Sequence, residues 1–100
     1  MTAYVVFFRE SPIHDPAEME AYQTSPRPTL ATGLAPLAVY GAQTPLEGKA
    51  PDGVVVLQFP SVEDAKAWYF SPEYQAAAAH RRKAADYRAV IVEGFELPQS

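Results

Sequence analysis

Hydrophobic and polar positions divide the chain into short apolar runs and two helical stretches. The apolar runs are rich in β-branched and aromatic residues, which is typical of strands, and they cover 3–9, 34–41, 54–59 and 88–95. Helix-forming patterns follow the first and third runs. The resulting β-α-β-β-α-β order, with short right-handed connections, predicts a ferredoxin-like α+β fold. In that fold the helices cover one face of an antiparallel sheet.

The expected helices begin at recognisable capping sequences. In the first, Asp15 can accept a hydrogen bond from the amide of Glu18, and Glu18 can reach back, while Pro16 fits the first helical position. The second helical stretch falls into two pieces, for which Ser61 and Ser71 are the expected caps. Because capping explains both serines completely, neither is a candidate nucleophile.

Prolines and glycines mark the expected boundaries. Pro26 disfavours helical geometry at the preceding residue, so we expect a kink or restart there, with Leu30 continuing the apolar side and Gly33 ending the helix. Pro36 cannot donate a backbone hydrogen bond and indicates an edge strand. This agrees with the topology, in which the second and fourth strands lie at the edges.

The strands lack the alternation expected of a sheet with one wet face. Residues 4–8, 54–57 and 89–92 are apolar on both sides, and the open face would expose more apolar surface than monomers usually tolerate. No spare element of a 100-residue chain could cover it. A second copy packing sheet to sheet is the simplest cover, so we expect a homodimer.

Composition fits one globular domain, residues 1–100 with a core from about 3 to 95, at 48% hydrophobic and 20% charged residues. The net charge is −4, and no stretch is basic enough to bind nucleic acid. With no cysteine, disulfides and thiolate chemistry are excluded. Residues 3–8 are too short an apolar run for a signal peptide or membrane span, so no membrane association and a cytoplasmic location are expected.

Two residues are candidates for catalysis. His14 precedes a helix start and could be a general base, or a loop histidine that packs on the helix. Tyr22 could present its hydroxyl to a ligand or be a packing residue. Neither His14 nor His80 has a second ligand at metal-binding spacing, so no metal and no cofactor are expected.

Ligand-binding candidates are aromatic residues and one arginine. Arg81, like His80, could be a solvated cation that complements the end of a helix; alternatively Arg81, seven residues after Tyr74, points inward to bind a carboxylate. Glu47 could be a turn residue or a cleft carboxylate. The remaining candidates could line a pocket or serve as core and interface anchors: Tyr40, Trp68, Tyr69 and Tyr74.

The segment 59–75, Phe-Pro-Ser-Val-Glu-Asp-Ala-Lys-Ala-Trp-Tyr-Phe-Ser-Pro-Glu-Tyr-Gln, resembles the bacterial family called domain of unknown function 1330. Shorter matches at 3–5, 15–16, 46–48 and 92–94, with an arginine at 81 or 82, extend the resemblance over about 3–95. It implies the dimeric α/β-barrel superfamily, in which two sheets pack face to face and ligands occupy a cavity between helices and sheet.

That family has no agreed activity, and its superfamily includes cofactor-free monooxygenases, isomerases, haem enzymes and amino-acid-sensing domains, so the fold alone does not choose a function. Members often carry Gly-Gly after the first helix and Arg-Gly-Gly after the second strand. Here Gly33-Leu-Ala and Tyr40-Gly-Ala stand in these places. If the family arginine binds an anion, this chain lacks it or replaces it with the Tyr40 hydroxyl.

Two functions remain open. The first is metal-free binding or transformation of a small organic molecule in a cleft between helices and sheet. The second is a non-catalytic dimeric interaction or sensing module. A polar-rimmed pocket with His14 or Arg81 pointing into it would favour the first, and a closed core the second.

Overall fold

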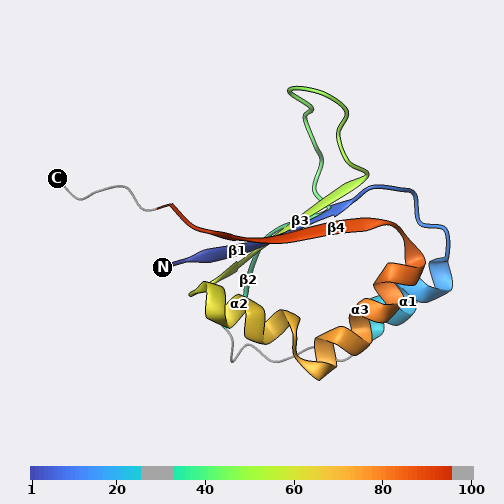
Figure 1. Ribbon diagram of the computed structural model, residues 1–100. Helices are drawn as coiled ribbons and strands as arrows, with labels where there is room; N and C mark the ends of the chain where they lie inside the picture. Colours follow the sequence, from blue (N-terminus) through green and yellow to red (C-terminus); the bar gives the residue numbers. More distant parts are fainter. Residues whose placement is uncertain (26–32, 96–100) are drawn as a thin grey trace.

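The computed structural model describes residues 1–25 and 33–95. In chain order the elements are β1 (Ala3–Arg9), α1 (Pro16–Thr24), β2 (Ala35–Val39), β3 (Gly53–Phe59), α2 (Val62–Tyr69), α3 (Pro72–Ala84) and β4 (Tyr87–Glu93). This is the predicted α+β order, with the second helical segment in two pieces (Figure 1).

The four strands form one antiparallel sheet in the order β2-β3-β1-β4. β1 and β3 are central and β2 and β4 lie at the edges, as predicted. Pro36 therefore lies in an edge strand, and the register of β2 against β3 shifts between Pro36 and Ala38. The rows of side chains run across the sheet: Val5 of β1 lies opposite Leu57 of β3 and Ile91 of β4.

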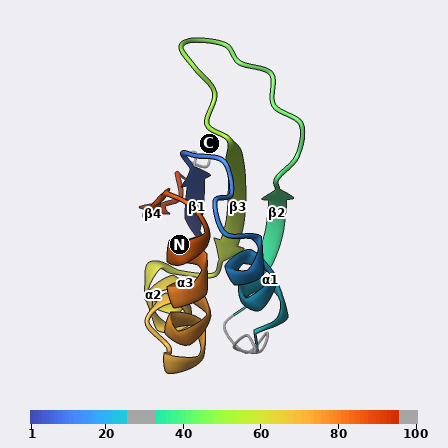
Figure 2. The ribbon, with the colours of Figure 1, turned by 90° about the vertical axis from the view of Figure 1, so that its right-hand side faces the viewer.

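Two strands are shorter than predicted. The second ends at Val39, because Tyr40 has a φ of 52° and turns the chain out of the extended conformation. The last strand ends at Glu93, and Gly94 still donates its backbone N–H to the carbonyl of Thr2, the residue opposite it in the register with β1. Beyond Tyr40 the connection to β3 projects away from the helices, with Leu46 90% exposed (Figures 1 and 2).

Each helix begins with the predicted cap. Asp15 Oδ1 accepts from the amide of Glu18 at 3.2 Å, Ser61 Oγ accepts from that of Asp64 at 3.1 Å, and Ser71 Oγ accepts from that of Tyr74 at 3.2 Å. The Glu18 side chain does not reach back to Asp15 as expected, because its carboxylate pairs with His80 instead. The expected kink at Pro26 and the continuation at Leu30 lie outside the described residues.

All the helices that the structure describes lie on one face of the sheet (Figure 1). α2 packs on the sheet, and α1 packs on α3. The core between these layers takes alternate residues from the central strands and aromatic residues from the helices: Val5, Phe7, Leu57, Phe59, Ala65, Trp68, Tyr74 and Ala78. Trp68 and Tyr74 join α2 to α3, with ring centroids 4.1 Å apart.

The opposite face of the sheet is mostly apolar. It is built from the intervening strand residues, which we call the open face: Tyr4, Val6, Phe8, Val54, Val56, Gln58, Arg88, Val90 and Val92. Val90 is 51% exposed and Val92 49% exposed. The structure thus keeps the strand pattern that motivates the homodimer, and a single chain forms an open sheet, not a closed barrel.

Candidate functional site

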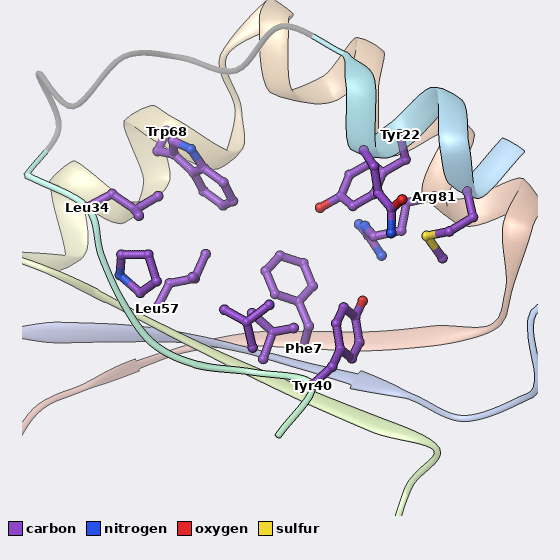
Figure 3. Close-up of a pocket in the computed structure, with 12 residues that line it drawn as sticks. Phe7, Tyr22, Leu34, Tyr40, Leu57, Trp68 and Arg81 are labelled. Atoms are coloured by element: carbon purple, nitrogen blue, oxygen red, sulfur yellow. The ribbon is translucent and has the colours of Figure 1, made fainter. Parts of the chain in front are cut away.

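A cavity of about 440 Å³ lies between the helices and the sheet (Figure 3). It falls within the range of about 300–1,000 Å³ typical of small-molecule sites. Its walls come from β1, α1, β2, β3, α2 and α3, and from residues that flank them: Phe7, Met19, Tyr22, Gln23, Leu34, Pro36, Val39, Tyr40, Val55, Leu57, Trp68 and Arg81.

The floor and one wall follow from strand and helix periodicity. Phe7 and Val55 are register partners and, with Leu57 two residues on, lie on the helix-facing side of the sheet. In α1, Met19 and Tyr22 share one face at i, i+3 spacing, and both line the pocket. The apolar floor and the α1 wall thus come from residues far apart in the sequence.

Arg81 is a buried cation in the wall of this pocket, 3% exposed. Its guanidinium carbon lies 4.9 Å from the ring centroids of both Phe7 and Tyr87, and 6.0 Å from that of Tyr22. Its Nε has no hydrogen-bond partner among the described residues. Of the alternatives for Arg81, the inward orientation is the one found, because α1 packs against α3 and covers this side of the helix.

Two pairs of tyrosines flank this arginine. The hydroxyls of Tyr22 and Tyr74 lie 3.1 Å apart, and those of Tyr40 and Tyr87 lie 2.6 Å apart. Burial raises the pKa of Tyr74, and Tyr22 adds to the effect, while the adjacent Arg81 charge opposes it. Burial and the hydrogen bond with Tyr87 raise the pKa of Tyr40. Tyr74 and Tyr40 are therefore neutral hydrogen-bonding groups at physiological pH.

A close approach at Gly53 sets the position of the Tyr40 ring. A Cβ on Gly53 would lie 2.6 Å from Cδ1 of Tyr40, so only glycine leaves room for the ring in this place. The guanidinium of Arg9 lies 5.8 Å from the centre of the same ring. Together with the positive φ of Tyr40, these contacts direct its hydroxyl toward Tyr87 at the pocket edge.

The histidines lie outside the pocket. His14 is exposed: its Nε2 is 3.9 Å from Oδ1 of Asp86, and its backbone N–H donates to the carbonyl of Ala84 at 2.8 Å. The candidate general base is therefore displaced from the cleft, because the loop that carries it packs on the end of α3. His80 is half-buried, with its Nδ1 2.5 Å from Glu18 Oε2, and is not the solvated helix end that was one alternative for it.

The other candidates divide between the pocket and the core. Tyr22, Tyr40, Trp68 and Arg81 are brought together in the pocket. Tyr74 lies behind Trp68, fully buried, and Tyr69 lines a separate depression with Val90 at the edge of the sheet. Of the two alternatives for Tyr74, the core position is the one found, since its ring packs against that of Trp68, and the half-buried ring of Tyr69 contacts the same tryptophan. Glu47 is exposed on the projecting connection.

Sequence reasoning missed several pocket residues. Gln23 adds an amide to the α1 wall. Beside the pocket, Tyr87 hydrogen-bonds to the hydroxyl of Tyr40, and its ring contacts the guanidinium of Arg81. Strand alternation is the signal that could have found the pocket floor, because Val55 and Leu57 alternate with residues of the open face. Within 1–25 and 33–95, no cluster of histidines and carboxylates could hold a metal ion.

The comparison with protein families decides the family. The model described as domain of unknown function (DUF1330) matches residues 2–95. The chain belongs to the DUF1330 family. No protein of curated function matches this DUF1330 chain in sequence. Among the helices of the described residues, none is both long and apolar enough to cross a membrane.

Solved structures similar to this DUF1330 protein share its fold. A protein of unknown function from Rhodopseudomonas palustris has a TM-score of 0.67 at 19% identity, covering 96% of this chain and 84% of that one. A member of the ethyl tert-butyl ether D family from Bacillus halodurans has a TM-score of 0.58 at 13% identity, covering 95% and 100%. A dimeric protein of unknown function with a ferredoxin-like fold, from Bacteroides fragilis, has a TM-score of 0.54 at 15% identity, covering 93% and 95%.

Proposed function

We propose that this DUF1330 protein binds a small, largely apolar organic molecule in the pocket between helices and sheet. The pocket itself carries the proposal: its lining is aliphatic and aromatic, with a few polar groups contributed by Tyr22, Gln23, Tyr40 and Arg81. An apolar cavity with a few convergent polar groups is the usual form of a small-molecule site. The pocket with Arg81 in its wall favours this function over the interaction module with a closed core.

The lining favours binding over acid–base catalysis. Among the described residues that line the pocket there is no histidine, carboxylate or serine. The raised pKa of Tyr40 makes its hydroxyl a weaker acid and keeps it protonated at neutral pH, so it serves neither as a proton donor nor as a base. The polar groups are therefore suited to orienting a bound molecule, and we assign recognition to Tyr22, Tyr40 and Arg81.

The single tryptophan of the chain provides the test, because Trp68 lies in the pocket wall. A panel of apolar molecules of one or two rings is titrated while tryptophan fluorescence and thermal unfolding are followed. A ligand that binds only the folded chain raises the melting temperature by mass action. We expect saturable quenching or a spectral shift together with a higher melting temperature for members of the panel.

A pair of variants tests whether the change in fluorescence and melting temperature comes from binding in the pocket. Val55→Phe adds a ring to the pocket wall and is expected to weaken binding at least tenfold, since the added ring takes the volume that a ligand would fill. Ala67→Phe adds the same ring to the exposed side of α2 and is expected to bind as the parent does. Equal binding by both variants, or no binding of any panel member by the parent protein, would contradict the proposal.

We also propose that two copies pack through their open faces. Val90 and Val92 are about half exposed in the single chain, and burial of such apolar surface is the main driving force of association. The similar protein from Bacteroides fragilis is dimeric by its description. Face-to-face packing would leave the pocket, on the opposite side of the sheet, accessible in each copy.

A further inference from the structure

We infer that the ligand of this pocket is an apolar monocarboxylate whose anionic group pairs with Arg81. The inference rests on the proposed function and deepens it by naming the class of ligand. It starts from a buried positive charge that has no counter-charge within the described protein.

Arg81 remains charged in this setting. A guanidinium keeps its proton at every physiological pH, and a buried ion is strongly unfavourable unless another group compensates it. The rings of Phe7 and Tyr87, each 4.9 Å away, provide cation–π stabilisation. Aromatic rings carry no net charge, however, so the pocket keeps an unneutralised positive charge in its wall.

No ion pair between described residues includes Arg81. Three carboxylates on or beside α1, α3 and β4 pair with other residues: Glu18 with His80, Glu10 with Arg88, and Asp86 with His14. The counter-ion therefore has to come from outside the described part of the chain, and the pocket is the space that adjoins Arg81.

The hydrogen bonds of Arg81 are incomplete in the same place. Its Nε is buried and has no acceptor among the described residues. Figure 3 shows the guanidinium between Tyr22 and Phe7, directed toward the cavity. A carboxylate in the cavity would accept from the guanidinium N–H groups that face it and would supply the counter-charge.

The rest of the lining limits the ligand to one anionic group. The other lining residues, which include Leu34, Val55, Leu57 and Trp68, offer no second cation. A second carboxylate would be buried among these side chains without a partner, at a large desolvation penalty. The geometry thus points to a hydrocarbon body, cyclic or aromatic, that ends in one carboxylate.

A matched pair of ligands tests the charge. Saturated 4-cyclohexylbutanoate and its neutral amide, 4-cyclohexylbutanamide, have the same shape and do not absorb where Trp68 is excited. Both are titrated by fluorescence and by calorimetry. Because a hydrogen bond to a charged group contributes about 1.5–3 kcal/mol, we expect the carboxylate to bind about 10-fold to 100-fold more tightly than the amide.

Two variants test whether Arg81 causes the preference for the carboxylate over the amide. Arg81→Met keeps the length and apolar contacts of the side chain, and we expect it to bind acid and amide alike. Arg82→Met removes an exposed arginine from the next position of α3 and should keep the preference. If Arg81→Met fails to fold, Arg81→Gln replaces it, and the ratio measured on the parent protein stands independently of either variant.

Each outcome decides between the two proposals. Equal binding of acid and amide by the parent protein would overturn the anionic ligand while leaving an apolar binding site. A preference that survives Arg81→Met or Arg81→Gln would overturn the role of Arg81. Absence of binding by both compounds and by the wider apolar panel would overturn the proposed function, and this inference with it.

Discussion

Tyr74 illustrates how packing changes the chemistry of one residue. Its ring is fully buried against Trp68, and burial raises the pKa of its hydroxyl, with a further contribution from Tyr22. In the unfolded chain the same hydroxyl ionises near pH 10. Between these two pKa values the unfolded state loses the proton and the folded state keeps it, so stability is complete below about pH 10 and decreases above it.

We therefore predict that the free energy of unfolding falls more steeply with pH in the parent protein than in Tyr74→Phe above about pH 10. The difference in slope has an upper limit of about 1.4 kcal/mol per pH unit, the value for one proton. Urea unfolding at several pH values between about 9 and 11.5 measures it. Equal slopes would show that Tyr74 ionises as readily in the folded state as in the unfolded one.

Some pocket residues could be predicted from the sequence alone, and the orientation of others could not. Tyr22, Tyr40 and Trp68 could be identified as pocket candidates because aromatic side chains are common in binding sites. For Arg81 the sequence allows both a solvated position and an inward one, because a cation in the last turn of a helix is usually solvated but can also point into a site. Only the packing of α1 on α3, a contact between segments distant in sequence, separates buried Arg81 from exposed Arg82.

Ser71 shows the energetic role of a cap at the scale of secondary structure. Its hydroxyl accepts from the amide of Tyr74 and lies 2.8 Å from the carbonyl of Trp68, to which it donates, so it fixes the corner between α2 and α3. We predict that Ser71→Ala lowers the free energy of unfolding by about 1 kcal/mol, the usual effect of losing a cap. Chemical denaturation measures the change.

Ser71→Asn is the matched control for this cap. Asparagine at the N-cap can accept the same backbone hydrogen bond, so this variant should retain most of the stability that alanine loses. Equal stability of Ser71→Ala and the parent would contradict the capping role. The starts of the helices were predictable from such short-range chemistry, whereas the end of β2 was not, because it depends on the contact between Tyr40 and Gly53.

Strand composition connects the sequence to the whole molecule. One set of alternating residues, including Val5 and Leu57, is buried under the helices. The other set, including Val90 and Val92, is equally apolar but lies on the open face. Periodicity predicted both faces without showing which would receive the helices; the handedness of the crossovers and the packing of α2 on the sheet decide that.

The open face leads to a prediction about assembly. If two copies pack through it, light scattering at micromolar concentration will give about twice the chain mass of 11.0 kDa. Val90→Arg combined with Val92→Arg places charges within that interface, on β4, and is expected to give the mass of a single chain, because buried unpaired charges strongly disfavour association.

Ala67→Arg is the control for this assembly, since Ala67 is exposed on α2 in the helical layer. It should leave the dimer intact, which separates charge placed on the open face from charge placed elsewhere on the surface. A parent protein that has the mass of one chain would overturn the dimer. Dissociation by Ala67→Arg while the double valine variant remains dimeric would instead move the interface to the helical side.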